Sequence, residues 1–227
     1  MLRETRLRAT ISGHILYSKF KSFDIRSRRD SRFTNLAPMT LQQLKQTLAK
    51  SQWISFAVEL RPSTIASQGG IKPFYCFRQF DYPDGDTFNL LFTSYADSYG
   101  KIPLAEMTIR GNLQYGQEHP IAAGAYEIDY TADVEFSIRL LNENLAKALN
   151  GLPLAEGVSP WAVNVQQNVT GKGVPAFGLT AGEYFKECDL IYIKDDLLFN
   201  GSRNIDGRPF DSPANRPTNL QIPMKKQ

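Results

Sequence analysis

The chain has 227 residues, of which 42% are hydrophobic and 22% are charged, and its formal net charge is +3. This composition is typical of globular proteins and excludes disordered, collagen-like and coiled-coil chains. Two cysteines and two histidines are too few for a disulfide framework or a Cys- or His-rich metal site. No apolar run approaches the ~18 residues of a membrane-spanning helix, so no such helix is indicated. From the composition we expect a soluble, globular, all-β protein.

The positive charge is concentrated at the start of the chain. Residues 1–38 hold nine Lys or Arg against three acids, a net charge of +6, so the rest of the chain carries −3. Such a segment is typical of a transit peptide or of an arm that binds nucleic acid or anionic lipid. It also fits a solvated tail, or extra sequence upstream of a start at Met39. We expect a poorly ordered arm over 1–38 that folding does not need, followed by a single domain over 39–227.

The folded part is predicted to begin with a short helix. Thr40 and Gln43 form a T-x-x-Q capping box, which marks the start of a helix. Leu41, Leu44 and Leu48 then fall on one helical face. Pro83-Asp84-Gly85 is a turn signal further along the chain and predicts a hairpin of the strands on either side of it.

Alternating apolar and polar residues predict strands through most of the remaining chain. The longest alternation covers 125–140, where the even positions are apolar and the odd positions polar, which implies one buried and one solvated face. A strand this long is usually bent or bulged, as in a closing barrel. The predicted strands are, in chain order, 53–61, 71–82, 88–95, 104–115, 125–140, 161–170, 188–194 and 197–200.

One more helix interrupts these strands. Asn142 is its predicted N-cap, Leu145 and Leu149 form its inner face, and Gly151 ends it. The tail, 201–227, is rich in Asn, Asp, Arg and Pro, and we expect its first part to wrap the body as an ordered loop. About eight strands and one or two short helices predict an antiparallel barrel or a strongly bent sheet.

The common catalytic signatures are absent from the sequence. It contains no phosphate-binding loop, no nucleophile elbow, no H-E-x-x-H and no C-x-x-C. His119 lies in a predicted surface turn, and the acids of 127–135 follow the solvated face of a strand. Cys76 and Cys188 lie on early and late strands that a closed sheet can bring together. Without a secretion signal we expect two buried free thiols.

Three charged residues occupy unexpected positions in the early strands. Glu59 and Arg61 share a strand face with Trp53, and Arg78 interrupts the apolar row that contains Phe74. A buried charge on such a row needs a partner. Two interpretations stay open: an ion pair that closes the sheet, and an arginine anchor for an anionic ligand headgroup, since the guanidinium fork binds carboxylates at two points.

A series of short elements runs in a recognisable order from about Trp53 to Pro223. In this order and spacing the chain resembles the adenomatosis polyposis coli down-regulated protein family. The elements are Glu59-Leu60-Arg61-Pro62, Ser94-Tyr95-Ala96-Asp97, Met107 to Gly111, Gly124 to Tyr130, Gln166 to Thr170 with Asn168 in place of an acid, Cys188-Asp189-Leu190, Leu198 to Gly201, and Arg216 to Gln221.

The resemblance implies an all-β fold, an antiparallel lipocalin- or calycin-like β-barrel with a lipid-type cavity, in a single-domain, microbial-type member. Animal members of the family are secreted or membrane-tethered inhibitors of Wnt signalling. This chain has two cysteines and no recognisable signal peptide or membrane anchor. We therefore carry over the barrel and its cavity, without Wnt antagonism, and we expect a cytoplasmic protein.

The predicted function is the binding of a small apolar ligand, of fatty acyl or isoprenoid type, in the barrel cavity. The alternatives are a cofactor-independent, calycin-like cyclase or isomerase that uses Glu59, Arg61 or Arg78, and an adaptor tethered through the basic arm. We expect an apolar small molecule or lipid as the partner and no metal, cofactor or nucleic acid; a homodimer stays open. The candidate ligand-binding residues are Trp53, Glu59, Arg61, Phe74, Arg78, Phe92, Tyr126, Tyr130 and Phe199.

Overall fold

A short helix precedes the sheet, as the capping box predicts. The computed structural model describes residues 37–62, 73–204 and 206–227, and the predicted basic arm lies outside them up to residue 36. Helix α1 (Leu41–Leu48) begins at Thr40, whose side chain accepts a hydrogen bond from the Gln43 backbone N–H. The side chain of Gln43 accepts from the Thr40 backbone N–H in return, so both halves of the capping box are present.

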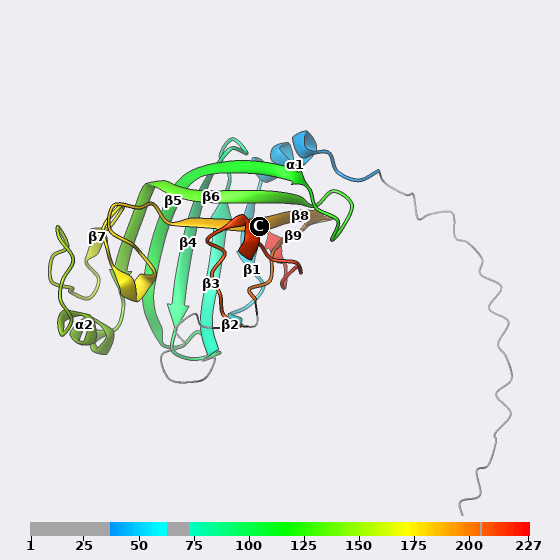
Figure 1. The fold of residues 1–227 in the computed structure, drawn as a ribbon. Helices are drawn as coiled ribbons and strands as arrows, with labels where there is room; N and C mark the ends of the chain where they lie inside the picture. Colours follow the sequence, from blue (N-terminus) through cyan, green and yellow to red (C-terminus); the bar gives the residue numbers. More distant parts are fainter. Residues whose placement is uncertain (1–36, 63–72, 205) are drawn as a thin grey trace, which may run out of the picture. The chain divides into compact units, whose positions relative to one another are not determined.

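Ten strands form one antiparallel sheet in the described part of the chain (Figure 1). A second short helix, α2 (Glu143–Asn150), follows the sixth strand. None of the described helices is long and apolar enough to cross a membrane. The strands are β1 (Gln52–Ser55), β2 (Glu59–Pro62), β3 (Pro73–Asp81), β4 (Thr87–Tyr95), β5 (Pro103–Glu118), β6 (Tyr126–Leu140), β7 (Gln166–Asn168), β8 (Lys186–Lys194), β9 (Leu197–Asn200) and β10 (Met224–Lys226).

The sheet closes on itself in a ring-like way through β1. Its strand order is β1-β10-β9-β8-β6-β5-β4-β3-β2, and β1 also pairs with β3. Trp53 illustrates the closure, because it lies opposite Lys226 of β10 on one side and Phe80 of β3 on the other. The prediction of an all-β, antiparallel fold with two short helices is therefore confirmed, and the C-terminal segment completes the ring.

The predicted strand over 53–61 is two strands in the structure. β1 pairs with the end of β3 and β2 with its beginning, but the two registers are offset, so residues 56–58 between them are not paired with β3. The alternation nevertheless holds across the break. Trp53 and Glu59 are buried, whereas the apolar side chains of Phe56 and Leu60 are 53% and 67% exposed. The face with the charged residues is therefore the inner one.

Two further predicted elements differ from the structure. The predicted strand 161–170 is reduced to β7, because the Asn150 side chain binds both the N–H and the carbonyl of Trp161 and holds that residue outside the sheet. The tail predicted as a loop contains β10, which the sequence analysis missed. Met224 in β10 is fully buried and lies opposite Ser55 and Leu198.

The long hairpin of β5 and β6 bends, as its length predicts. The register shifts between Arg110 and Asn112, and Gly111 sits in the bend. A Cβ atom on Gly111 would lie 1.8 Å from the carbonyl oxygen of Thr131, so only glycine fits there. The bend also turns Val134 outward, and its side chain is 62% exposed although the alternation predicts it buried.

Helix α1 packs its apolar face onto one end of the inner face of the sheet. Leu44 and Leu48 are fully buried in the same apolar cluster as Phe80, Phe88 and Ile128. Figure 1 shows α1 at the end of the sheet that contains the turns connecting β3 to β4 and β5 to β6. α1 therefore closes one end of the ring-like sheet, and the charged residues of β2 and β3 lie further along it.

Candidate functional site

A buried ion cluster lies where β2 joins β3. Glu59 is opposite Cys76 in the register and Arg61 is opposite Phe74, so both side chains share the inner face with Arg78. The Arg78 side chain is only 4% exposed and connects two other members of the cluster. Its Nε donates to Glu59 Oε1 at 2.9 Å, and its Nη1 donates to Asn200 Oδ1 at 2.9 Å.

Glu59 is the anion that both arginines share. Ser55 Oγ donates to Glu59 Oε1 at 2.6 Å, and Arg61 Nε donates to Glu59 Oε2 at 3.0 Å. Burial opposes ionisation of this carboxyl, but the guanidinium groups of Arg78 and Arg61 outweigh burial and hold the pKa of Glu59 below its ordinary value. Glu59 is therefore a carboxylate at neutral pH, and the ion pair that the sequence analysis considered is present.

A chain of polar side chains continues from Arg78 into the core. Asn200 Nδ2 lies 3.3 Å from the Tyr130 hydroxyl, which lies 3.2 Å from the Tyr82 hydroxyl. Burial raises the pKa of both tyrosines above the ordinary value, so both phenols keep their protons. The network thus joins residues of five strands: Ser55 from β1, Glu59 from β2, Arg78 from β3, Tyr130 from β6 and Asn200 from β9.

Two buried donors near this network have no hydrogen-bond partner among the described residues. They are Arg78 Nη2 and Trp53 Nε1. Buried polar groups are normally paired, and each exception calls for a water molecule, an ion or a ligand. The guanidinium carbon of Arg78 lies 5.8 Å from the centre of the Phe80 ring, and Trp53 is directly opposite Phe80. Both donors are therefore neighbours of one ring.

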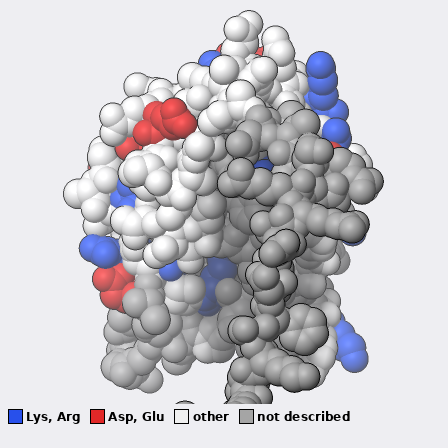
Figure 2. All heavy atoms as spheres, turned by 90° about the vertical axis from the view of Figure 1, so that its right-hand side faces the viewer, with Lys and Arg blue, Asp and Glu red and all other residues white. Residues whose placement is uncertain are grey.

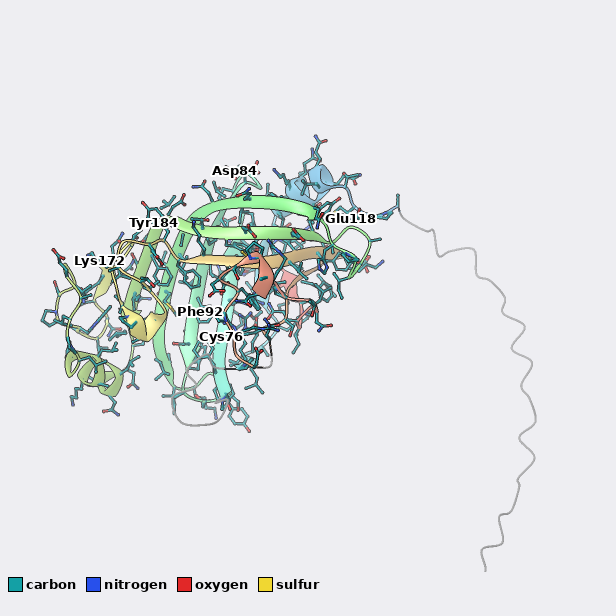
Figure 3. The ribbon with its side chains drawn as sticks, viewed as in Figure 1. Cys76, Asp84, Phe92, Glu118, Lys172 and Tyr184 are labelled. Carbon is teal, nitrogen blue, oxygen red and sulfur yellow. The ribbon has the colours of Figure 1, made fainter. Side chains whose placement is uncertain are left out.

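An apolar surface adjoins the ion cluster on the inner face of the β3–β4 hairpin. Phe92 lies opposite Arg78 and Leu90 lies opposite Phe80. The Phe92 ring stacks on Phe74, with 5.8 Å between ring centres. The side chains of Phe74, Leu90 and Phe92 are only partly buried. Arg78 and Phe80 beside them are buried. Figure 3 shows Phe92 and Cys76 towards the end of the sheet that is farther from α1.

Two predicted site residues do not join this cluster. Tyr126 is partly buried at the α1 end, and its hydroxyl donates to the Met39 carbonyl at 3.2 Å. The prediction that Phe199 faces inward is wrong, because its β9 neighbours Leu198 and Asn200 occupy the buried face. Phe199 instead packs against Tyr192, with 5.7 Å between ring centres. The other predicted residues, Trp53, Glu59, Arg61, Phe74, Arg78, Phe92 and Tyr130, lie on the inner face.

Sequence reasoning missed three members of the network. Ser55 and Asn200 lie on buried strand faces, the buried Tyr82 directly follows β3, and each of the three bonds to a residue far along the chain. One signal for Asn200 is present in the sequence, because it follows Leu198 at a spacing of two in a strand and so shares the buried face of that leucine. A buried asparagine needs partners.

Asp189 is a buried acid with an unusual ionisation. Its Oδ1 accepts hydrogen bonds from the backbone N–H groups of Leu190 at 2.7 Å and Gly201 at 2.8 Å. Burial and the nearby Glu187 carboxylate raise the pKa of Asp189 to about 7, and the two backbone hydrogen bonds and the positive charge of Arg78 only partly oppose this rise. Asp189 therefore changes its charge near neutral pH.

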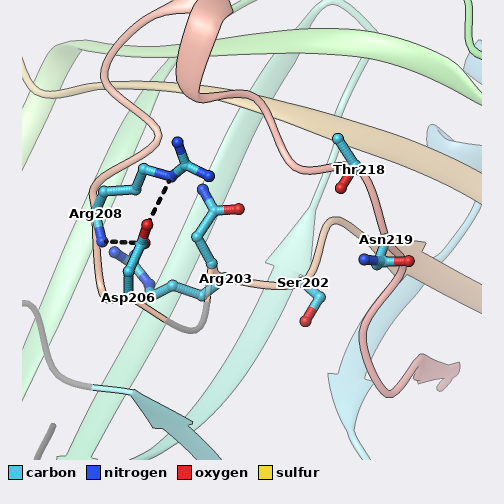
Figure 4. Close-up of a pocket in the computed structure, with 7 residues that line it drawn as sticks. Ser202, Arg203, Asp206, Arg208, Thr218 and Asn219 are labelled. Atoms are coloured by element: carbon cyan, nitrogen blue, oxygen red, sulfur yellow. Dashed lines mark hydrogen bonds and ion pairs between the residues drawn. The ribbon is translucent and has the colours of Figure 1, made fainter.

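A polar pocket lies apart from these residues, between the segments that follow β9 and precede β10 (Figure 4). It has a volume of about 270 Å³. Each of its two arginines already has an acid partner, since Arg203 contacts Glu187 at 3.2 Å and Arg208 contacts Asp206 at 3.2 Å. The lining residues are Ser202, Arg203, Asn204, Asp206, Arg208, Thr218 and Asn219. This pocket is polar, unlike the apolar cavity that the sequence analysis expects.

The remaining groups on the described residues offer little other chemistry. Cys76 and Cys188 are both buried and free, as expected. The described residues contain no group of three or more His, Cys, Asp or Glu that could hold a metal ion. Among the residues that are not grey in Figure 2, basic and acidic side chains are scattered over the visible face. A single basic patch is the usual footprint of nucleic-acid binding.

Together these features define an all-β protein whose ring-like antiparallel sheet encloses a buried ion cluster beside an apolar surface. The family model described as adenomatosis polyposis coli down-regulated 1 matches residues 31–155, more than half of the chain. The chain belongs to this family, as the sequence resemblance indicates. The matched region contains Glu59, Arg61, Arg78 and Phe92, whereas Asn200 and β10 lie beyond it.

Proposed function

We propose that this protein binds a small apolar ligand, of fatty acyl or isoprenoid type, on the inner side of a lipocalin-like barrel. The observation that carries the proposal is the apolar surface of Phe74, Leu90 and Phe92. These side chains point to the inside of the ring-like sheet, yet they stay partly accessible to solvent. Apolar side chains on a concave inner face are the usual lining of a ligand site.

The arrangement around this surface gives such a ligand an orientation. Helix α1 packs Leu44 and Leu48 into the core at one end, and the Glu59–Arg78 ion cluster lies beside Phe92. An elongated apolar molecule would therefore lie along Phe74 and Phe92 with its polar end at Arg78. Small barrels of about eight strands hold either side chains alone or one small ligand, so the accessible inner face favours the second alternative.

Binding is tested by two measurements on the purified protein. Native mass spectrometry should detect a co-purifying lipid, and a fluorescent polyene acyl probe and an isoprenoid alcohol should bind at one site. Phe92→Ala should weaken binding tenfold to a hundredfold, because burying an aromatic ring contributes about 1.5–3 kcal/mol. If no acyl or isoprenoid probe binds to the unaltered protein, the proposed function is wrong.

Phe199→Ala is the matched control for this variant. Phe199 is also a partly buried ring in a stacked aromatic pair, but it packs against Tyr192 away from the inner face. The control variant should bind the probes as the unaltered protein does, per folded molecule. Equal loss of affinity in the Phe92 and Phe199 variants would contradict a ligand on the inner face.

We also propose that the protein works in the cytoplasm. The support for this is chemical, since Cys76 and Cys188 are buried free thiols and thiols persist in reducing compartments. Fractionation of cells that produce the protein, followed by immunodetection, tests the location. Recovery in an oxidising compartment or with membranes would overturn it.

A further inference from the structure

The interior beside Phe80 contains more hydrogen-bond donors than acceptors. Arg78 Nη2 and Trp53 Nε1 are buried donors without a partner among the residues that the structure describes. An arginine Nη carries two N–H groups, and an indole Nε1 carries one that can only donate. Each of these groups therefore calls for an oxygen acceptor that the described side chains do not supply.

A third donor comes from the tyrosine pair. The hydroxyls of Tyr82 and Tyr130 share one hydrogen bond, at 3.2 Å, which uses one of their two protons. Asn200 Nδ2 contacts the Tyr130 oxygen as a further donor, not as an acceptor. Whichever tyrosine donates within the pair, one phenolic proton remains without an acceptor in these contacts. Because burial raises the pKa of both groups, that proton stays in place at neutral pH.

Each acceptor of the network already has at least one donor within the network. Glu59 Oε1 accepts from both Ser55 and Arg78, and Glu59 Oε2 accepts from Arg61. Asn200 Oδ1 accepts from Arg78 Nη1. Within these direct contacts two guanidinium cations face one carboxylate. Burial and the Arg61 charge lower the pKa of Arg78 below the ordinary value for arginine.

The residues that carry the three unpartnered donors are all neighbours of Phe80. Trp53 is opposite Phe80 across the β1–β3 pair, and the Arg78 guanidinium carbon is 5.8 Å from the centre of the Phe80 ring. The same ring lies 5.5 Å from the Tyr82 ring and 5.9 Å from the Tyr130 ring, centre to centre. A single small acceptor group beside Phe80 therefore adjoins residues that carry all three kinds of donor.

We infer that the ligand of this protein is an apolar monocarboxylic acid whose carboxylate binds in the interior beside Phe80, at Arg78 Nη2 and the donors next to it. This inference rests on the proposed function and assigns the chemistry of the ligand's polar end. A carboxylate only accepts hydrogen bonds and brings the missing negative charge. A neutral alcohol brings no charge, and an ammonium group would face two guanidiniums. The apolar tail extends along Leu90 and Phe92, which lie opposite Phe80 and Arg78.

The test compares three probes with one tail and different ends. Dodecanoic acid, 1-dodecanol and dodecylamine are titrated into the full chain by calorimetry, at concentrations at which each probe is dissolved as single molecules. The acid should bind tenfold to a hundredfold more tightly than the alcohol, which is the usual value of one charge-assisted hydrogen bond. The amine should bind more weakly than the alcohol. Equal affinities for acid and alcohol would overturn the inference but leave apolar-ligand binding intact.

Two variants locate the carboxylate. Arg78→Met should reduce the affinity for the acid to that for the alcohol. Arg139→Met is its matched control, because Arg139 pairs with Glu106 on the outer face and also has a buried Nε without a partner. The control should keep the preference for the acid. Loss of the preference in both variants would contradict a specific role of Arg78.

Trp53→Phe keeps the test decisive if Arg78→Met does not fold. It removes one N–H group and retains an apolar ring, so the affinity for dodecanoic acid should fall about 2- to 10-fold while that for dodecanol stays unchanged. Trp161→Phe is the control, since Trp161 is equally buried but packs against Phe177. An equal fall for acid and alcohol in Trp53→Phe would show an effect of ring packing and overturn the assignment. If none of the three probes binds, the proposed function itself fails.

Discussion

Glu59 is the residue on which the buried charges depend. It is the carboxylate bonded to both Arg61 and Arg78, and its side chain is 9% exposed. In Glu59→Gln two guanidiniums would stay buried without this anion, and we expect the free energy of unfolding to fall by about 3–5 kcal/mol. Urea denaturation of the purified variant measures the change.

Glu106→Gln serves as the comparison for that variant. Glu106 pairs with Arg139, whose side chain is 41% exposed, and exposed ion pairs contribute about 0–1 kcal/mol. Similar losses in both variants would mean that the Glu59 cluster adds nothing beyond an ordinary surface pair.

Asp189 makes stability depend on pH. Its pKa of about 7 in the folded protein lies above the ordinary value of 3.8, so between these values the folded state binds a proton that the unfolded state has lost. Stability from this group is therefore largest at low pH and falls as the pH rises from about 4 to 7. At about 1.4 kcal/mol per pH unit the whole difference is about 4 kcal/mol.

Asp189→Asn should remove this dependence. Thermal unfolding between pH 5 and pH 8 should show a fall in stability with rising pH in the unaltered protein and a flatter profile in the variant. The window starts at pH 5 because Glu59, whose pKa is lowered from 4.5, loses its stabilising charge only at lower pH. Parallel profiles would place the titration on another group.

The sequence reveals the charged residues of the site but not their neighbours. Arg78 is predictable because it interrupts an apolar row, and Glu59 because its strand face also carries Trp53. The hydrogen-bond partners of Asn200 and Tyr82 are not predictable in this way. Their partners, Arg78 and Tyr130, are brought to them by strand pairings that a single sequence does not contain.

The bend in the β5–β6 hairpin depends on one glycine. Gly111→Ala would place a Cβ against the Thr131 carbonyl and the Ala132 backbone, and backbone atoms cannot move away cheaply. We expect a loss of at least about 3 kcal/mol in the free energy of unfolding. Chemical denaturation checks it, with Gly151→Ala as the control.

Gly151 is a suitable control because it ends α2 at φ −79°, a conformation open to alanine. A Cβ there would lie 3.3 Å from the Ala148 carbonyl oxygen, so a small adjustment is enough. If Gly111→Ala is as stable as Gly151→Ala, the bend does not require glycine.

Elements with strong local signals are the ones that the sequence predicts well. The capping box predicts the start of α1, and the alternation over 125–140 predicts β6, which covers Tyr126–Leu140. No local pattern in the sequence marks the interruption between β1 and β2 or the position of β10. The first depends on pairing with β3, and the second depends on pairing with β1 and β9. Long-range pairing thus decides what local pattern cannot.

At the scale of the whole molecule, the prediction for the basic arm stays open to a direct test. Residues 37–227 form one compact unit by their own contacts. A chain that starts at Ala37 should therefore keep the melting temperature of the full chain within about 2 °C. A fall of more than about 8 °C, on the order of 2 kcal/mol or more for a domain of this size, would mean that folding needs the arm.

The pairing of Trp53 with both Phe80 and Lys226 also has a consequence for how the protein folds. The first contact joins nearby parts of the chain and can form early, whereas the second joins segments about 170 residues apart and forms slowly. Until β10 docks, β1 and β9 keep unpaired edges on the side that β10 covers. During that interval another chain can add to those edges, so aggregation competes with the last step of folding.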